Sequence, residues 1–327
     1  MSKQLLQKQA DTIRFLAADM VQQANSGHPG APMGLADIAT VLSKHLNINP
    51  ADEKWLNRDR LVFSGGHATG LVYSLLHLWG FDVSINDIKK FRQTHSKTPG
   101  HPEYGHTHGI EITTGPLGQG IANAVGFAMA AKYAQNSLGK DVINHKVYCL
   151  CGDGDLQEGI SYEATSTAGH LKLDNLVIIY DSNSITIEGD TSLSWTENVK
   201  KRFQAIDFEV IEIDGHNFEQ IDKALIAAKE SELPVLIIAK TAIAKGAVTM
   251  EGSHHSHGAP LGEEEIAKSK AKAGFDPEQK FFVPADVKGA FDKLIVGSTS
   301  QNAWYDSLSA ESKAKIEELQ NPNFDSI

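Results

Sequence analysis

The sequence has few cysteines, no long apolar run and no excess of positive charge. Its two cysteines, Cys149 and Cys151, cannot form a disulfide framework, which favours a reducing, cytoplasmic location. The most apolar stretch, residues 235–239, is far shorter than the roughly 20 residues of a membrane-spanning helix, and the polar N-terminus does not resemble a signal peptide. With 30 Lys and Arg against 41 Asp and Glu, the net charge of −11 argues against nucleic acid or anionic lipid as partners.

The composition that is present is typical of a globular protein with a large core, since 41% of the 327 residues are apolar and 22% are charged. Short, continuously apolar segments alternate with segments of helical periodicity. The predicted strands are residues 61–63, 147–150, 176–180, 210–213 and 235–239. Because these strands lack apolar–polar alternation and helices separate them, they predict an α/β fold: a parallel sheet with helices on both faces.

Apolar periodicity and helix-breaking residues predict the helices and the loops. The expected helices are residues 3–24, 35–46, 71–79, 84–91, 121–133, 158–168, 197–205, 218–229 and 263–273. Residues 94–116 and 242–260 are rich in Gly and His, and loops of this length are usually either functional or disordered. From Phe275 onward the sheet pattern stops, and helical fragments and a linker are expected.

Two neighbouring strand ends carry oxygen ligands. Asp153 lies in a Gly-Asp-Gly run after one predicted strand, and Asn183 follows the next strand. Ligands of open parallel sheets bind beyond the carboxyl ends of the strands, so both side chains are expected at one point. Carboxylate and amide oxygens suit Mg²⁺ or Ca²⁺, and Mg²⁺ usually completes its shell with water and phosphate oxygens, which implies a bound diphosphate. A simple strand-end turn is the alternative.

The sequence has 14 histidines, and four of them are expected to converge on one crevice as a polar, titratable pocket. These four lie in loops bounded by Gly or Pro: His28, His67, His101 and His257. Others are interpreted as scattered surface residues: His45, His77, His145 and His170. A zinc site is a rival hypothesis, without a cysteine or a tightly spaced ligand pair to support it, for His95, His101, His106 and His108.

The glycine-rich run at residues 115–120 precedes a predicted helix. It is not a dinucleotide-binding fingerprint, because the glycine spacing differs and no strand precedes it. It fits either backbone packing against a flat ligand or a plain helix start.

Six segments, in this order along the chain, resemble the signature segments of transketolases. They are residues 26–34 (SGHPGAPMG), 64–67 (SGGH), 97–102 (KTPGHP), 113–120 (TTGPLGQG), 152–154 (GDG) and 256–260 (SHGAP). The resemblance covers about residues 5–275 and implies the N-terminal, diphosphate-binding half of such an enzyme, with the thiamine-diphosphate-binding fold. It implies a domain at 1–275 that binds thiamine diphosphate and Mg²⁺, and a helical extension and linker at 276–327 toward a pyrimidine-binding domain.

The resemblance also implies roles for individual residues. The Mg²⁺ ligands, with Ca²⁺ or Mn²⁺ as possible replacements, are expected to be Asp153, Asn183 and the backbone carbonyl of Ile185. The residues expected to contact the cofactor are His67, Gly115, Pro116, Leu117, Gly154, Asn183 and His257. The residues expected to face the sugar and move protons are His28, His101 and His257.

Transketolases transfer a two-carbon ketol unit from a ketose phosphate to an aldose phosphate in the pentose phosphate pathway, as homodimers, and this is the activity that the resemblance implies. They are about twice as long as this sequence, and their second domain carries the glutamate that activates the cofactor. This chain alone is therefore expected to be inactive, with the pyrimidine-binding domain supplied by the same or a partner chain. Two alternatives stay open: a non-catalytic binding module, or one chain of a split transketolase.

Overall fold

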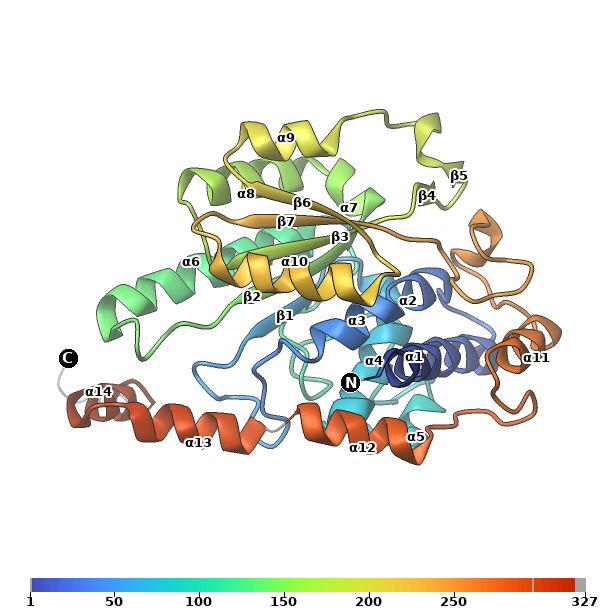
Figure 1. Ribbon diagram of the computed structural model, residues 1–327, viewed down its shortest axis with the longest axis horizontal. Helices are drawn as coiled ribbons and strands as arrows, with labels where there is room; N and C mark the ends of the chain where they lie inside the picture. The colour runs from blue at the N-terminus through green and yellow to red at the C-terminus, as the bar shows by residue number, and fades with distance from the viewer. Residues whose placement is uncertain (1, 296, 321–327) are drawn as a thin grey trace.

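The computed structural model describes residues 2–295 and 297–320, and in this part of the chain five strands form one parallel sheet (Figure 1). The strands are β1 (Arg60–Phe63), β2 (Val147–Gly152), β3 (Leu176–Ser182), β6 (Glu209–Asp214) and β7 (Val235–Lys240). Their order is β1-β2-β3-β7-β6, and every neighbouring pair is parallel. All five predicted strands and their parallel pairing are confirmed. β7 lies inside the sheet because it is continuously apolar, whereas the glutamates of β6 suit an edge.

The helices occupy the predicted regions, with differences at their ends. Their bounds are α1 (Lys3–Ala24), α2 (Gly30–Gly34), α3 (Ala36–Leu42), α4 (Thr69–Trp79), α5 (Ile85–Ile88), α6 (Gln119–Leu138), α7 (Asp153–Gln157), α8 (Gly159–His170), α9 (Val199–Ala205), α10 (Phe218–Glu230), α11 (Glu263–Lys272), α12 (Ala285–Leu294), α13 (Gly297–Ser307) and α14 (Ala310–Gln320). The helix expected at 35–46 is shorter in the structure: α3 ends at Leu42, and a separate short helix, α2, precedes it. The predicted helix at 158–168 begins one residue later, because Glu158 is extended (ψ 139°) and separates α8 from α7.

Side chains that alternate along the strands enter two different cores. On β2, Tyr148 and Leu150 pack with α1, α3, α4 and α10, whereas Cys149 and Cys151 pack with α6, α8 and α9. Figure 1 shows these two groups of helices on opposite faces of the sheet. The prediction of helices on both faces is therefore confirmed.

The helices after residue 284 pack against the helices and loops that surround the sheet. α12 buries Val287 and Phe291 completely in the core that contains α1 and α4. In α13, the indole N–H of Trp304 donates to the carbonyl of Val142 at 3.0 Å. Helices α12, α13 and α14 lie where helical fragments were expected. The boundary between 275 and 276 and the linker stay predictions, and residues 321–327 of that linker lie outside the described residues.

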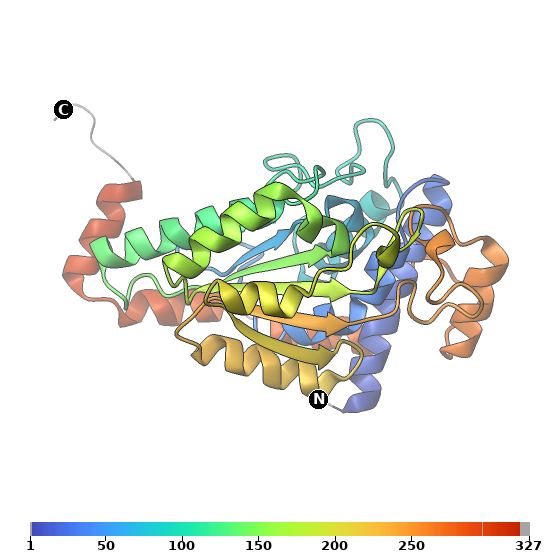
Figure 2. The ribbon, with the colours of Figure 1, turned by 90° about the horizontal axis from the view of Figure 1, so that it is seen from above.

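The loops at the carboxyl ends of the strands carry little regular structure. Residues 94–116 contain neither helix nor strand, as predicted, and a small hairpin follows β3, formed by β4 (Ile185–Thr186) and β5 (Gly189–Asp190). Figure 2 shows this hairpin and the loop after β7 at the end of the sheet toward which the strands point. These loops are placed to form a site. In residues 2–295 and 297–320, no helix combines the length and the apolar character that crossing a bilayer requires.

Candidate functional site

A pocket of about 340 Å³ opens at the carboxyl edge of the sheet. Its walls come from the loops that follow α1, β1, β2, β3 and β7 and from the loop that precedes α6. The predicted site residues that line it are His28, His67, His101, Gly115, Leu117, Asp153, Gly154, Asn183, Ile185 and His257. Pro116 does not line the pocket, although both of its neighbours do. Sites in open parallel sheets lie at this edge, so the position agrees with the expectation from the strand ends.

Asp153 is the first residue of α7 and is 5% exposed. Its Oδ1 accepts a hydrogen bond of 2.5 Å from the hydroxyl of Tyr180, and Oδ2 has no hydrogen-bond partner in the described part of the chain. Burial raises the pKa of Asp153 to about 6, and the hydroxyl of Tyr180 and the nearby backbone amides of Asn183 and Ser184 offset part of this rise. A buried oxygen without a partner destabilises the fold unless a ligand satisfies it, so Asp153 fits a cation that prefers oxygen ligands.

Asn183 and Ile185 follow β3, the strand paired with β2, so they lie next to Asp153. The amide nitrogen of Asn183 donates to Asp181 at 3.0 Å, and its amide oxygen accepts the backbone N–H of Ile185 at 2.9 Å. An amide oxygen has two lone pairs, so one remains for a cation. The three predicted metal ligands therefore share one wall of the pocket.

The rings of His28, His67 and His257 form a cluster with centroid distances of 5.1 to 5.7 Å. Burial lowers the pKa of His67 to about 3 and that of His28 to about 4, and neighbouring imidazoles add to both shifts. Burial also lowers the pKa values of His101 and His257. At neutral pH these rings are uncharged, and each offers one N–H donor and one lone pair. The cluster is suited to binding hydroxyl groups and phosphate oxygens by hydrogen bonds rather than by charge.

Glycines let the pocket loops touch each other. A Cβ on Gly66 would lie 2.7 Å from the backbone nitrogen of Gly115, and a Cβ on Gly154 would lie 2.9 Å from the side chain of Leu117. The glycine-rich run at 115–120 does start a helix, because Gly118, with φ of +77°, is the N-cap of α6. It also lines the pocket through Gly115 and Leu117, so the two hypotheses for this run are compatible.

The four histidines of the rival zinc hypothesis do not share a site. His101 lines the pocket described above, whereas His108 lines a different cavity. The Nε2 of His106 lies 2.8 Å from the carbonyl oxygen of Ser96. Across residues 2–295 and 297–320, no group of three or more His, Cys, Asp or Glu side chains is arranged to hold a metal ion. A cation at Asp153 would also need the side-chain amide oxygen of Asn183 and the backbone carbonyl of Ile185, which are not among these four side-chain types.

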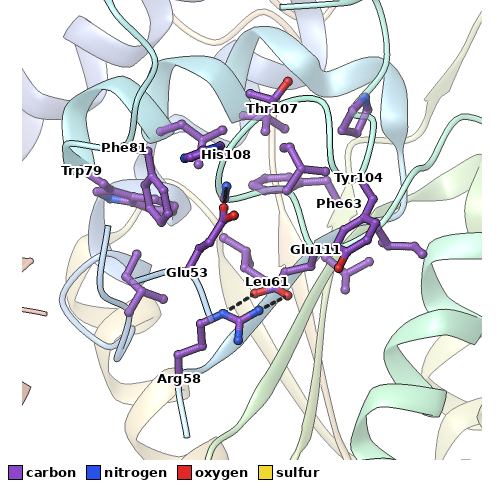
Figure 3. A pocket seen from close by; sticks show the side chains of 18 of the residues that line it. Glu53, Arg58, Leu61, Phe63, Trp79, Phe81, Tyr104, Thr107, His108 and Glu111 are labelled. Carbon is purple, nitrogen blue, oxygen red and sulfur yellow. Dashed lines mark hydrogen bonds and ion pairs between the residues drawn. The ribbon is translucent and has the colours of Figure 1, made fainter. Parts of the chain in front are cut away.

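The cavity that His108 lines is larger, about 530 Å³, and lies between β1, α4 and residues 102–112 (Figure 3). Most of its charged side chains are bonded within the protein. Arg58 donates two hydrogen bonds, of 3.2 and 2.8 Å, to the carboxylate of Glu111. Glu53 accepts the backbone N–H of Gly109 at 2.9 Å. Despite its size, this second cavity offers fewer polar atoms in need of a ligand.

One histidine that was expected on the surface is buried. His145 is 9% exposed, and burial lowers its pKa to about 3 with a further contribution from Arg60 and Arg58. It precedes β2, and its backbone N–H donates to Asn57, which holds the segment against the core. Of the other three, His170 is exposed, and His45 and His77 are half-buried with their ring nitrogens bonded to Asp222 and to the carbonyl of Val83.

Sequence reasoning missed two residues that support the site. Tyr180 bonds Asp153 from the end of β3, and nothing in its apolar strand indicated this contact. Asp155 is fully buried and accepts hydrogen bonds from three different loops. Its position three residues after Gly152 is the spacing of a helix-capping carboxylate, which was the available signal.

Together these features define a class: α/β domains with a pocket at the carboxyl edge of a parallel sheet, lined by polar side chains and glycine-containing loops. Residues 5–324 match the family model of the transketolase, thiamine diphosphate binding domain, and the chain belongs to this family.

Relatives with known names support this membership. The chain is 51% identical over 313 residues to transketolase 1 of Aliivibrio fischeri, covering 94% of this chain and 47% of the relative. The crystal structure of transketolase from Campylobacter jejuni superposes with a TM-score of 0.97 at 63% identity, over 100% of this chain and 52% of that one. A transketolase of Pichia stipitis in complex with sedoheptulose-7-phosphate superposes with a TM-score of 0.92 at 44% identity, over 97% of this chain and 48% of that one. The chain thus spans about half the length of these relatives.

Proposed function

We propose that this chain is the cofactor-binding half of a transketolase and that it binds thiamine diphosphate through Mg²⁺, with Ca²⁺ or Mn²⁺ as possible substitutes. The observation that carries the proposal is the buried, unpartnered Oδ2 of Asp153, in a pocket that Asn183 and Ile185 also line. Membership of the thiamine-diphosphate-binding family supports it. The metal ligands are Asp153, Asn183 and the carbonyl of Ile185.

The other pocket residues divide into two groups by the chemistry they offer. The cofactor contacts are His67, Gly115, Pro116, Leu117, Gly154, Asn183 and His257. Glycines allow the backbone to approach a diphosphate. When bound, the cofactor supplies an electron sink for cleavage of a carbon–carbon bond beside a carbonyl group.

His28, His101 and His257 bind the sugar and move protons at its hydroxyl groups. Because their pKa values are lowered, the uncharged rings accept a proton through one nitrogen and donate one through the other. The complete reaction is transfer of a two-carbon ketol unit from a ketose phosphate to an aldose phosphate, in the cytoplasmic pentose phosphate pathway. The active form is a homodimer, in which a pyrimidine-binding domain of the same or a partner chain completes the site.

Titration and an activity assay test this function. The 327-residue chain is titrated calorimetrically with thiamine diphosphate in the presence of Mg²⁺ and then in the presence of EDTA. It is then assayed with a ketose-phosphate and aldose-phosphate pair, alone and after addition of a separately expressed C-terminal half of a related transketolase. We expect Mg²⁺-dependent binding, no turnover by the chain alone, and turnover after mixing.

Each alternative has its own outcome. Turnover by the chain alone would contradict the assignment as a half enzyme. Mg²⁺-dependent binding without turnover after mixing would favour a non-catalytic binding module. A separate gene for the C-terminal half beside the gene of this chain would identify a split enzyme, whereas in-frame continuation would identify a segment of one chain.

A further inference from the structure

Asp155 is a buried carboxylate whose oxygens are bonded to the protein. It lies in α7, two residues after Asp153, and has no exposed surface. Its Oδ1 accepts the hydroxyl of Ser64 at 2.7 Å and the backbone N–H of Gly118 at 2.9 Å. Its Oδ2 accepts the backbone N–H of Gly152 at 2.9 Å. The three donors lie in the loop after β1, in the loop before α6 and at the last residue of β2, and all three of these segments border the candidate pocket.

Asp155 and Ser64 together replace a missing helix cap. The N-cap of α6 is Gly118, which has no side chain to accept the first free N–H groups of the helix. Asp155 accepts the N–H of Gly118, and the hydroxyl oxygen of Ser64 accepts the N–H of Ile121 at 3.2 Å. The negative charge of Asp155 at this helix N-terminus is favourable as well. Asp155 and Ser64 therefore fix where α6 begins.

The segment after β1 and the segment that leads into α6 are also packed too closely to move independently. A Cβ on Gly120 would lie 2.4 Å from the Cα of Ser64, and a Cβ on Gly66 would lie 2.7 Å from the nitrogen of Gly115. Because these contacts are between backbones, a shift of one loop displaces the next. The hydrogen bonds of Asp155 join the same segments from beneath the pocket.

We propose that Asp155 is a positioning residue, which holds residues 64–67, 115–118 and 152–154 in the one arrangement that receives the diphosphate end of the cofactor. This inference rests on the proposed function. It differs from the role of Asp153: that side chain has an oxygen free for a ligand, whereas Asp155 acts through the backbone groups it holds.

The test compares Asp155→Asn with Asp59→Asn. Asp59 is likewise a buried carboxylate that accepts two backbone N–H groups, those of Asn47 and Lys146, but it lies before β1 at the second cavity. In each variant the new amide has one acceptor oxygen, so its NH₂ group faces a backbone donor and one hydrogen bond is lost. Both variants should melt at a lower temperature than the wild type. Because both variants lose a similar buried hydrogen bond, a difference in cofactor affinity between them reports an effect on the pocket rather than an effect on stability.

We expect Asp155→Asn to weaken binding of thiamine diphosphate with Mg²⁺ by about 10- to 100-fold, the usual range for groups that orient ligands. Asp59→Asn should leave this affinity within about threefold. In the ligand-free chain, hydrogen exchange should be faster in Asp155→Asn at Gly118, at Gly152 or at both, since these are the backbone amides that Asp155 accepts, and unchanged there in Asp59→Asn. This second readout does not depend on the cofactor.

Four outcomes decide the inference. Wild-type affinity and wild-type exchange in Asp155→Asn would overturn it. Equal loss of affinity in both variants would also overturn it, because the effect would then be one of stability. If Asp155→Asn does not fold, Ser64→Ala takes its place, and wild-type affinity of that variant overturns the inference. Failure of the wild-type chain to bind the cofactor would instead refute the proposed function, while faster exchange at Gly118 would still show that Asp155 holds the loop.

Discussion

The two cavities described above differ in what their polar groups are bonded to. In the larger cavity, beside β1, Arg58 and Glu111 bond each other through two hydrogen bonds. In the smaller pocket, Oδ2 of Asp153 and Nδ1 of His28 are buried without partners in the described part of the chain. Leaving a buried polar group unpaired costs roughly 1–3 kcal/mol. The difference teaches that unmet hydrogen bonds indicate a ligand site here, whereas cavity volume does not.

The largest expected effect is that of Asp153→Ala in the smaller pocket. This change removes the free carboxylate oxygen, so Mg²⁺-dependent affinity for thiamine diphosphate should fall by more than about 100-fold, beyond the range for an outer-shell partner. Stability of the ligand-free chain should stay within about 1 kcal/mol of the wild type, since removal of the unpaired buried Oδ2 offsets the loss of the hydrogen bond from Tyr180 to Oδ1. Calorimetric titration and urea unfolding measure the two quantities. Unchanged affinity would show that the two cavities do not differ as proposed.

The next effect concerns the histidines of the same pocket. His28→Ala and His257→Ala, each in the complete enzyme with its C-terminal half, should lower kcat by about 10²- to 10⁴-fold, because proton transfer and sugar positioning are lost. Cofactor affinity should fall far less than kcat. Steady-state kinetics at saturating cofactor provide the measurement. A decrease of less than threefold in kcat at both positions would reduce them to ordinary loop histidines.

In the larger cavity the expected effect is on stability. Glu111→Gln leaves Arg58 without its charged partner, so the free energy of unfolding should fall by about 1–3 kcal/mol. Affinity for thiamine diphosphate with Mg²⁺ should stay within about threefold of the wild type. Urea unfolding and titration test both statements. A tenfold loss of cofactor affinity in this variant would break the distinction between the two cavities.

The smallest expected effect is in the pH dependence of stability. The folded pKa values of His28 and His67 are about 4 and 3, whereas the unfolded value is about 6.5, so the unfolded chain binds more protons between these limits. These two residues therefore lower stability as the pH falls from 6.5 toward 4. The pKa of Asp153, raised to about 6, acts in the opposite sense.

Replacing both histidines isolates their part of this profile. The double variant His28→Gln/His67→Gln should lose less stability than the wild type between about pH 7 and about pH 6, by on the order of 1 kcal/mol. Urea midpoints of the ligand-free chain at the two pH values measure the change. His170→Gln, at an exposed position, is the matched control. Parallel profiles for wild type and double variant would contradict the burial-lowered pKa values.

Local patterns in the sequence predicted most of the fold. Continuously apolar runs located β2, β3 and β7. The position of β7 between β3 and β6 was not predicted, because it depends on how two crossover connections pack rather than on any local pattern. The break between α7 and α8 depends on the extended backbone of Glu158, which no propensity indicates.

The site was predictable where it depends on chain position and not where it depends on side-chain contacts. Strand ends placed Asp153 and Asn183 together, because parallel strands end at one edge. The contacts of Tyr180 and Asp155 needed the three-dimensional arrangement, since their partners lie far along the chain. Pro116 was expected to contact the cofactor from its motif, yet the pocket is lined by its two neighbours.

The burial of both cysteines has a practical use. Cys149 and Cys151 lie in the middle of the sheet, 0% and 3% exposed, and burial raises their pKa values well above the ordinary range. Thiol reagents attack the thiolate, so Cys149, the cysteine that does not border the pocket, is inert until β2 opens. The rate at which a thiol reagent labels Cys149 therefore times the opening of the central sheet. In any variant discussed above, slow labelling together with weak cofactor binding would locate the damage in the pocket loops, whereas rapid labelling would locate it in the fold.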